Sequence, residues 1–414
     1  MHVTWIGHAC LMVETQQGTL LTDPWLVDPC LYNVVVHQCR PALSVDTLPS
    51  VDVLCVTHAH YDHFDPRTLQ HLSKTALVII PSSPLRRLEQ KLRALGFTRI
   101  HTLPYWQTVD ACGMSITAVP SQNIPEECGF VIRSGNSTIF HAADSVYWPY
   151  ARQLGQFDID VAFVPYTGWE VSGTIGVDVA RQWQPDWEET VRNATSIGAR
   201  CLVPSSCDQF WSPPSLRWLN DRVHPGRADE FIAAVDAYRA KTPGIKAEAV
   251  AMTPGSSWSK TGGFQIRPAD GSEPVAIPDP EPSATKVPLA ELITRARQFV
   301  STRRPQLLAC LKDNPIGVWV LLSSRHTFYL HDTDCYFRLH LLDPRGVYAL
   351  NEDTPGTPRI SITSQDAYDL FAGNIDAEMI VMGARAKVIR NKTEWDLIRI
   401  YAMEYLFVKE TYSG

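Results

Sequence analysis

Seven consecutive residues hold four side chains that can bind a metal ion, and they constrain the fold more than any other stretch of the chain. The stretch reads Thr57-His58-Ala59-His60-Tyr61-Asp62-His63. It follows residues 51–56, a short apolar run rich in β-branched side chains, which predicts a buried strand. We therefore expect this histidine loop at the carboxyl end of a strand.

The spacing within the histidine loop suits two neighbouring metal positions. In an irregular turn His58 and His60 can face one point, while Asp62 and His63 face a second point close by. Imidazole binds zinc, iron and manganese, whereas a carboxylate either binds a metal or accepts a proton. We predict all four residues as metal ligands, with Asp62 also the candidate catalytic base.

Strand and helix patterns alternate after this loop. Asp65 and Pro66 predict a capped helix start, residues 76–80 a strand, and residues 84–95 a second helix. Further strands are expected at residues 99–103, 107–110, 114–119, 129–133 and 138–141. This alternation predicts a layered α/β domain.

The histidine loop resembles the HxHxDH signature of the metallo-β-lactamase superfamily, which lies at a strand end in an αββα sandwich. The first 25 residues are similar to the opening hairpin of the lactonase-like branch of that superfamily, and the resemblance runs to about residue 265. It implies that Asp144, in the turn after the strand at 138–141, is the carboxylate that bridges two metals. We also expect Asp23 to orient the histidine loop.

Two histidines of the usual two-metal site are missing from this sequence. The first is expected between Val119 and Gly129, where Glu126 and Glu127 stand, and the second after Pro204, where the chain reads Ser205-Ser206-Cys207-Asp208. Replacing imidazole by carboxylate favours hard metals such as iron or manganese over zinc. We predict one or two metal ions, with iron favoured, and Glu126 or Glu127 as a further ligand; the alternative is that both are solvated loop charges.

The order of motifs is also similar to the metallo-β-lactamase part of CMP-N-acetylneuraminate hydroxylase, a family that takes electrons through its own Rieske domain. No cysteine here is followed two residues later by histidine, as a Rieske site requires. The resemblance implies a non-haem iron oxygenase or hydroxylase supplied with electrons by a separate protein. The alternative is a metallohydrolase of the lactonase or phosphodiesterase type that uses metal-bound hydroxide; a binding protein with a degenerate site is disfavoured.

Composition limits the partners. The formal net charge of -7 gives no electrostatic reason to expect nucleic acid, and no apolar run approaches the length of a bilayer span. Scattered cysteines and the absence of a signal-peptide pattern predict a cytoplasmic protein. A small polar or nucleotide- or sugar-like metabolite is the expected substrate, and aromatic loop residues are the candidates to stack on it: Trp106, Tyr166, Trp169 and Trp211.

A chain of 414 residues predicts more than one domain. Prolines punctuate residues 266–288, which predicts an extended linker between a catalytic domain at 1–265 and a second domain at 289–414. The second domain reads as an amphipathic helix or helix pair at 288–311, strands that begin at 317–322, and a last helix at 395–407. This order resembles the α+β sterol-carrier-protein-like fold, with a role in packing or homo-oligomerisation as the alternative.

Overall fold

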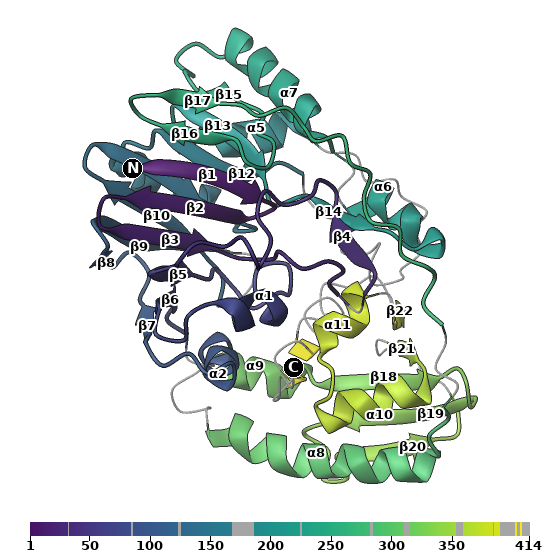
Figure 1. Ribbon diagram of the computed structural model, residues 1–414. Coiled ribbons are helices and arrows are strands. Elements are labelled where there is room, and N and C mark those ends of the chain that lie inside the picture. Colours follow the sequence, from purple (N-terminus) through teal and green to yellow (C-terminus); the bar gives the residue numbers. More distant parts are fainter. Residues whose placement is uncertain are drawn as a thin grey trace.

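A computed structural model describes most of the chain (Figure 1). The residues that it does not describe are 32, 84–85, 123–125, 168–185, 224–225, 282–284, 310–314, 353–358, 384, 390–401, 404–405 and 408–414. Among the residues described, no helix combines the length and the apolar character that crossing a bilayer requires.

Two β-sheets form the centre of the amino-terminal domain. The first has the strand order β17-β16-β1-β2-β3-β5-β6-β7, and the second has the order β15-β13-β12-β11-β10-β9-β8. The strands of the first sheet are β1 (His2–Gly7), β2 (Cys10–Thr15), β3 (Gly18–Thr22), β5 (Val53–Cys55), β6 (Leu77–Pro81), β7 (Ile100–Leu103), β16 (Ser257–Ser259) and β17 (Gly263–Gln265). Those of the second are β8 (Thr108–Ala111), β9 (Met114–Pro120), β10 (Cys128–Ser134), β11 (Ser137–His141), β12 (Val161–Pro165), β13 (Cys201–Ser205) and β15 (Glu248–Ala249).

Helices cover the outer face of each sheet. On the first sheet lie α1 (Pro66–His71) and α2 (Arg87–Ala94), and on the second lie α3 (Ala151–Leu154), α5 (Trp187–Thr195) and α7 (Ala228–Lys241). Asp65 caps α1, as its position before Pro66 predicted, by accepting hydrogen bonds from the backbone of Arg67 and Thr68. The αββα order expected from the sequence is confirmed.

The side chains of strand β5 show why this sequence forms a layered structure of sheets and helices. Val53 and Cys55 face the apolar core between the two sheets, whereas Leu54 and Val56 face the core under α1 and α2. Successive strand residues point to opposite faces, so a strand buried on both sides must be apolar throughout. Each such side chain contributes about 1.5–3 kcal/mol by leaving water, and the histidine loop begins where this buried strand ends.

Segments at the rim connect the two sheets. Strand β4 (Val35–His37) lies in the segment between β3 and β5 and pairs with β14 (Gln209–Trp211). Short helical turns η3 (Pro214–Leu219) and α6 (Asn220–Val223) contact β14, whereas η1 (Trp148–Tyr150) and η2 (Gly155–Phe157) adjoin α3.

The carboxyl-terminal unit is an α+β module. Its sheet has the order β20-β19-β18-β21-β22 and packs with helices around one apolar core. The elements are α8 (Leu289–Ala309), α9 (Pro315–Ser323), β18 (Arg325–Leu330), β19 (Cys335–His340), β20 (Val347–Leu350), β21 (Arg359–Ile362), α10 (Ser364–Ala372), α11 (Ala377–Met382) and β22 (Lys387–Ile389). Most of the expected last helix at 395–407 lies outside the described residues.

One expected strand is a helix. Residues 317–322 lie in α9, where Val318 and Leu322 are 37% and 64% exposed while Val320 between them is fully buried. Alternate residues of a strand share one face, so this exposure pattern has the period of a helix. A short apolar run does not distinguish a buried strand from a buried helix, and Pro315 at the first position favours the helix.

Between the two units, residues 266–281 and 285–288 carry no helix or strand and are mostly exposed. Two backbone groups of this stretch nevertheless bind Ser212: its hydroxyl donates to the carbonyl of Val275 and accepts from the amide of Ile277. The amide of Val287 donates to Ser364 and anchors the start of the second unit. That residues 266–288 separate independently folding domains stays a prediction.

Candidate metal centre

The candidate site lies where several strands end together. β3 runs parallel to β5, and β11 runs parallel to β12 and β13, so the residues that follow β3, β5, β11 and β13 meet at one edge of the sandwich. These residues include Asp23, the histidine loop, and Asp144 in the turn after His141. Ligands in α/β folds characteristically bind at such carboxyl ends.

Asp23 holds the loop in place. Its fully buried carboxylate accepts hydrogen bonds from the amide and hydroxyl of Thr57, both at 2.8 Å, from His141 Nε2 at 2.8 Å, and from His63 Nδ1 at 3.3 Å. Burial alone would raise the pKa of Asp23, but the hydrogen bonds from His141 and His63 lower that pKa to about 2. Asp23 therefore remains a carboxylate and orients the loop, as expected.

This network leaves the Nε2 lone pair of His58 directed at the site. Thr57 donates its only hydroxyl proton to Asp23, so the hydroxyl must accept from His58 Nδ1, 2.9 Å away. His58 Nε2 is therefore unprotonated, and burial together with the neighbouring His63 and His60 lowers the pKa of His58. His63 likewise turns Nδ1 towards Asp23. Metal-binding histidines characteristically use one nitrogen for such a contact and the other for the metal.

The donor atoms of the predicted ligands form two adjoining groups. In the first, His58 Nε2 lies 3.0 Å from His60 Nδ1 and 3.9 Å from Asp144 Oδ2. In the second, His63 Nε2 lies 3.4 Å from Asp62 Oδ2 and 3.3 Å from the same Asp144 oxygen. Two ligands of one ion with bonds of about 2.0–2.2 Å lie about 3 Å apart. The donor set therefore fits one or two divalent metal ions, with Asp144 between the two positions.

One side of the second group is formed by residues that are not metal ligands in the usual site. The amide of Asp208 donates to His8 Nδ1, so Nε2 of His8 carries the proton and donates to Asp62 Oδ2 at 3.1 Å. The side-chain amide of Gln209 donates to the same oxygen. Burial would raise the pKa of Asp62, but His63 and His8 hold it well below its usual range.

Comparison with known proteins assigns the amino-terminal domain. Residues 19–205 match the model of the Beta-lactamase superfamily domain. The first domain belongs to the metallo-β-lactamase superfamily.

The relatives of this metallo-β-lactamase domain carry two kinds of name. A Mycobacterium tuberculosis protein named provisionally as a Rieske 2Fe-2S iron-sulfur protein is 28% identical over 247 aligned residues, and the match covers 53% of this chain and 46% of the relative. A metal-dependent hydrolase of Pyrobaculum arsenaticum is 27% identical over 192 residues, covering 44% of this chain and 80% of the relative. The chain thus spans about half the length of the first of these curated relatives.

Among solved structures, the diiron β-hydroxylase CmlA of Streptomyces venezuelae resembles the chain with a TM-score of 0.40 and 19% identity. The likeness covers 60% of this chain and 52% of CmlA.

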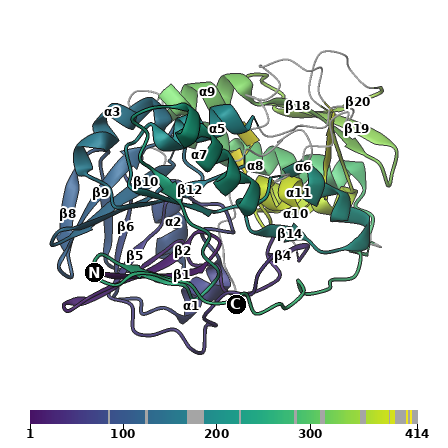
Figure 2. The same cartoon turned by 90° about the horizontal axis from the view of Figure 1, so that it is seen from above.

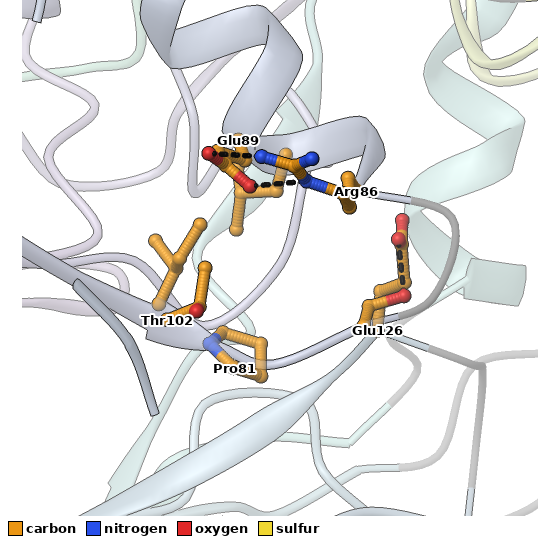
Figure 3. Close-up of a pocket in the computed structure, with 8 residues that line it drawn as sticks. Pro81, Arg86, Glu89, Thr102 and Glu126 are labelled. Carbon is orange, nitrogen blue, oxygen red and sulfur yellow. Dashed lines mark hydrogen bonds and ion pairs between the residues drawn. The ribbon is translucent and has the colours of Figure 1, made fainter. Parts of the chain in front are cut away.

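The two glutamates proposed as substitutes for a missing histidine lie apart from the donor groups of the metallo-β-lactamase site. Glu126 is buried, accepts hydrogen bonds from the Ser83 hydroxyl and the Arg87 amide, and lies 3.5 Å from Arg87 Nε. Figure 3 shows Glu126 at a small pocket that Arg86 and Glu89 also line. Glu127 accepts from Ser121 at 2.6 Å. The structure therefore gives both carboxylates protein partners and does not bring either of them to the histidines.

The aromatic side chains proposed to stack on a substrate mostly pack in the interior. Trp211 is fully buried beside β4, and Tyr166 is buried against Phe231. Trp106 is half-buried and contacts the ring of Tyr150. Trp169 lies outside the described residues. Of the three that are described, only Trp106 is placed to offer part of its ring to a ligand.

Three residues of the site were not predicted from the sequence as site residues. His8 lies in the turn between β1 and β2 of the opening hairpin. Its spacing from neighbouring residues does not resemble that of a metal-binding motif. Gln209 follows the position where the second missing histidine was expected. Glu378 comes from α11 of the carboxyl-terminal unit, far from any motif, and its donor oxygen lies within 4.8 Å of donors from His60 and Asp62. Burial raises the pKa of Glu378 to about 7.

Proposed function

We propose that this chain is a non-haem iron oxygenase or hydroxylase that receives electrons from a separate protein. The observation that carries the proposal is the donor set of the first group: two imidazoles, His58 and His60, and one carboxylate, Asp144. Two histidines and one carboxylate with open positions are the set that non-haem iron oxygenases use. The second group, Asp62 and His63, adds a position for a second ion.

Within this proposal, a bound iron would supply the binding and reduction of dioxygen, and the protein's own residues have defined tasks. Thr57 and Asp23 fix the ring orientations of His58 and His63 by hydrogen bonding to the Nδ1 atoms. His8 and Gln209 hold Asp62 in its ligand orientation. Such outer contacts tune ligand basicity and keep the donors in place before the metal arrives.

The electron donor is proposed from two facts. Relatives over the same region are named as Rieske proteins, and they are about twice as long as the matched region. This sequence contains no Cys-x-His pair of the Rieske type. We therefore propose an external iron-sulfur protein as the reductant, and a small polar or nucleotide- or sugar-like metabolite as the substrate.

A metallohydrolase is the second candidate, and the match to metal-dependent hydrolases favours it. In that mechanism Asp62 would act as general base. Its Oδ2 atom already accepts hydrogen bonds from His8 and Gln209, and its pKa lies well below the usual range. An efficient base at neutral pH needs a pKa near 7, so this environment suits a metal ligand better than a base.

Metal analysis joined to two activity probes tests the proposal without knowledge of the substrate. Protein purified without chelator is expected to contain iron. After anaerobic reduction and removal of the reductant, it should take up dioxygen in proportion to that iron, and His58→Ala should not. Two zinc ions per chain, no dioxygen uptake, and hydrolysis of a simple ester such as p-nitrophenyl acetate would overturn the oxygenase in favour of the hydrolase.

A further inference from the structure

Helix α11 of the carboxyl-terminal unit docks directly on the histidine loop. The views in Figures 1 and 2 agree that α11 lies beside β4 and β14, and Met379 of this helix packs on the apolar cluster formed by these strands. Three polar side chains are buried at this contact: Tyr61 of the histidine loop, and Asp376 and Glu378 of the carboxyl-terminal unit.

Helix α11 forms its hydrogen bonds to the histidine loop through Tyr61, which stands between the predicted ligands His60 and Asp62. The amide of Tyr61 donates to Glu378 Oε1 at 2.7 Å, and its hydroxyl donates to Asp376 Oδ2 at 2.8 Å. Asp376 also caps α11 and lies 3.5 Å from Lys91 Nζ, which neutralises part of its charge. These contacts fix Glu378 against the backbone of the histidine loop itself.

The position of Glu378 is within reach of the metal. Its donor oxygen and donors from His60 and Asp62 all lie within 4.8 Å of one another. Ligands on opposite sides of one ion lie about 4.4 Å apart when each bond is about 2.2 Å. All three side chains are buried. Small changes in their side-chain torsion angles would bring the three donor atoms to bonding distance of one ion.

We propose that Glu378 is a metal ligand supplied by the carboxyl-terminal unit, so that the metal centre is complete only when the two units are docked. The inference rests on the proposed iron centre and adds a residue to it. Glu378 takes the place of one of the two imidazoles that the sequence lacks, and its hard oxygen favours iron or manganese over zinc. A cation between Asp62 and Glu378 also offsets the cost of burying these two carboxylates close together.

The variant Glu378→Gln separates a ligand from a docking contact. Glutamine keeps an oxygen that can accept the hydrogen bond of the Tyr61 amide, but it lacks the anionic charge that holds a metal. We expect the iron affinity of the full-length protein, measured by competition with a chelator and by metal analysis after dialysis, to fall at least 10-fold. This estimate takes the lower end of the roughly 10- to 100-fold loss seen when contacts behind the ligands are removed.

Two further variants serve as controls. Glu291→Gln removes an exposed carboxylate of α8 and should leave the iron affinity unchanged. Glu378→Asp keeps the charge on a shorter side chain, so it should bind iron more tightly than Glu378→Gln and change the visible spectrum of the cobalt(II)-substituted protein, which reports coordination. This spectrum keeps the proposal testable if Glu378→Gln folds poorly.

The outcomes distinguish this inference from the proposed function. If Glu378→Gln and Glu378→Asp both keep the iron affinity and the cobalt spectrum of the parent, Glu378 is only a docking residue and the inference is wrong, whatever the parent does with dioxygen. If both variants lose metal while the parent shows hydrolysis without dioxygen uptake, the shared metal centre stands and the oxygenase is wrong.

Discussion

The two units of this protein contribute to one site by different means. The metallo-β-lactamase domain supplies its donors from the histidine loop after β5 and from Asp144 in the turn after β11, where parallel strands end at one edge. The carboxyl-terminal unit supplies Glu378 from a short helix that reaches the site only by docking on Tyr61. Spacing along the chain therefore reveals the first kind of donor, whereas only the packing of the two units reveals the second.

The largest effect on stability and metal binding is expected for Asp23→Ala, which removes the carboxylate that orients the histidine loop. The change leaves the amide and hydroxyl of Thr57 and the ring nitrogens of His63 and His141 without their shared acceptor. We expect a loss of about 3–5 kcal/mol in the free energy of unfolding, as for breaking a buried charged contact, together with loss of the metal. Urea unfolding followed by circular dichroism measures the first. Asp46→Ala at an exposed position is the control and should change little.

A second large effect is expected within the carboxyl-terminal unit. Phe337 is fully buried and stacks on Phe328 with ring centroids 4.7 Å apart. Phe337→Ala should destabilise this unit by about 3–5 kcal/mol. Because α11 belongs to the same core, calorimetry should show an earlier transition for this unit and metal analysis should show weaker iron binding. Full metal retention after that transition would mean that the first domain builds the site alone.

A smaller effect is expected for Thr57→Val, which keeps the shape of the side chain. It removes the hydroxyl that binds Asp23 and fixes the Nδ1 proton of His58. Iron affinity should fall by about 10- to 100-fold, as for other contacts behind metal ligands. Chelator competition measures this change, with Thr47→Val, at an exposed turn, as the matched control. An unchanged affinity would show that His58 is oriented by other means.

The smallest effect tests the corrected element of the second unit. In α9, Leu322 is 64% exposed and Val320 is fully buried, although both would share one face of a strand. Leu322→Lys should therefore shift the free energy of unfolding by no more than about 0.5 kcal/mol, as at other surface positions, whereas Val320→Lys should destabilise the unit strongly. If denaturant titrations showed equal destabilisation by both variants, residues 317–322 would form a strand rather than a helix.

Much of the first domain was predictable because its signals are local. A buried strand, the Asp65 cap and the HxHxDH spacing each follow from a few adjacent residues, and parallel strands then bring their ends together. The partner of Glu126 was not predictable, since Arg87 and Ser83 reach it across the fold. The helix α9 was mistaken for a strand because an apolar run without clear period fits both.

The most direct test of the metal centre is anomalous X-ray diffraction at the iron absorption edge, on crystals of the full-length protein loaded with iron. We expect a peak bonded to His58, His60 and Asp144, and a second peak beside Asp62 and His63 when both positions are filled, with Asp144 between them. A peak at another place in the molecule, or Asp144 turned away from the iron, would contradict this prediction.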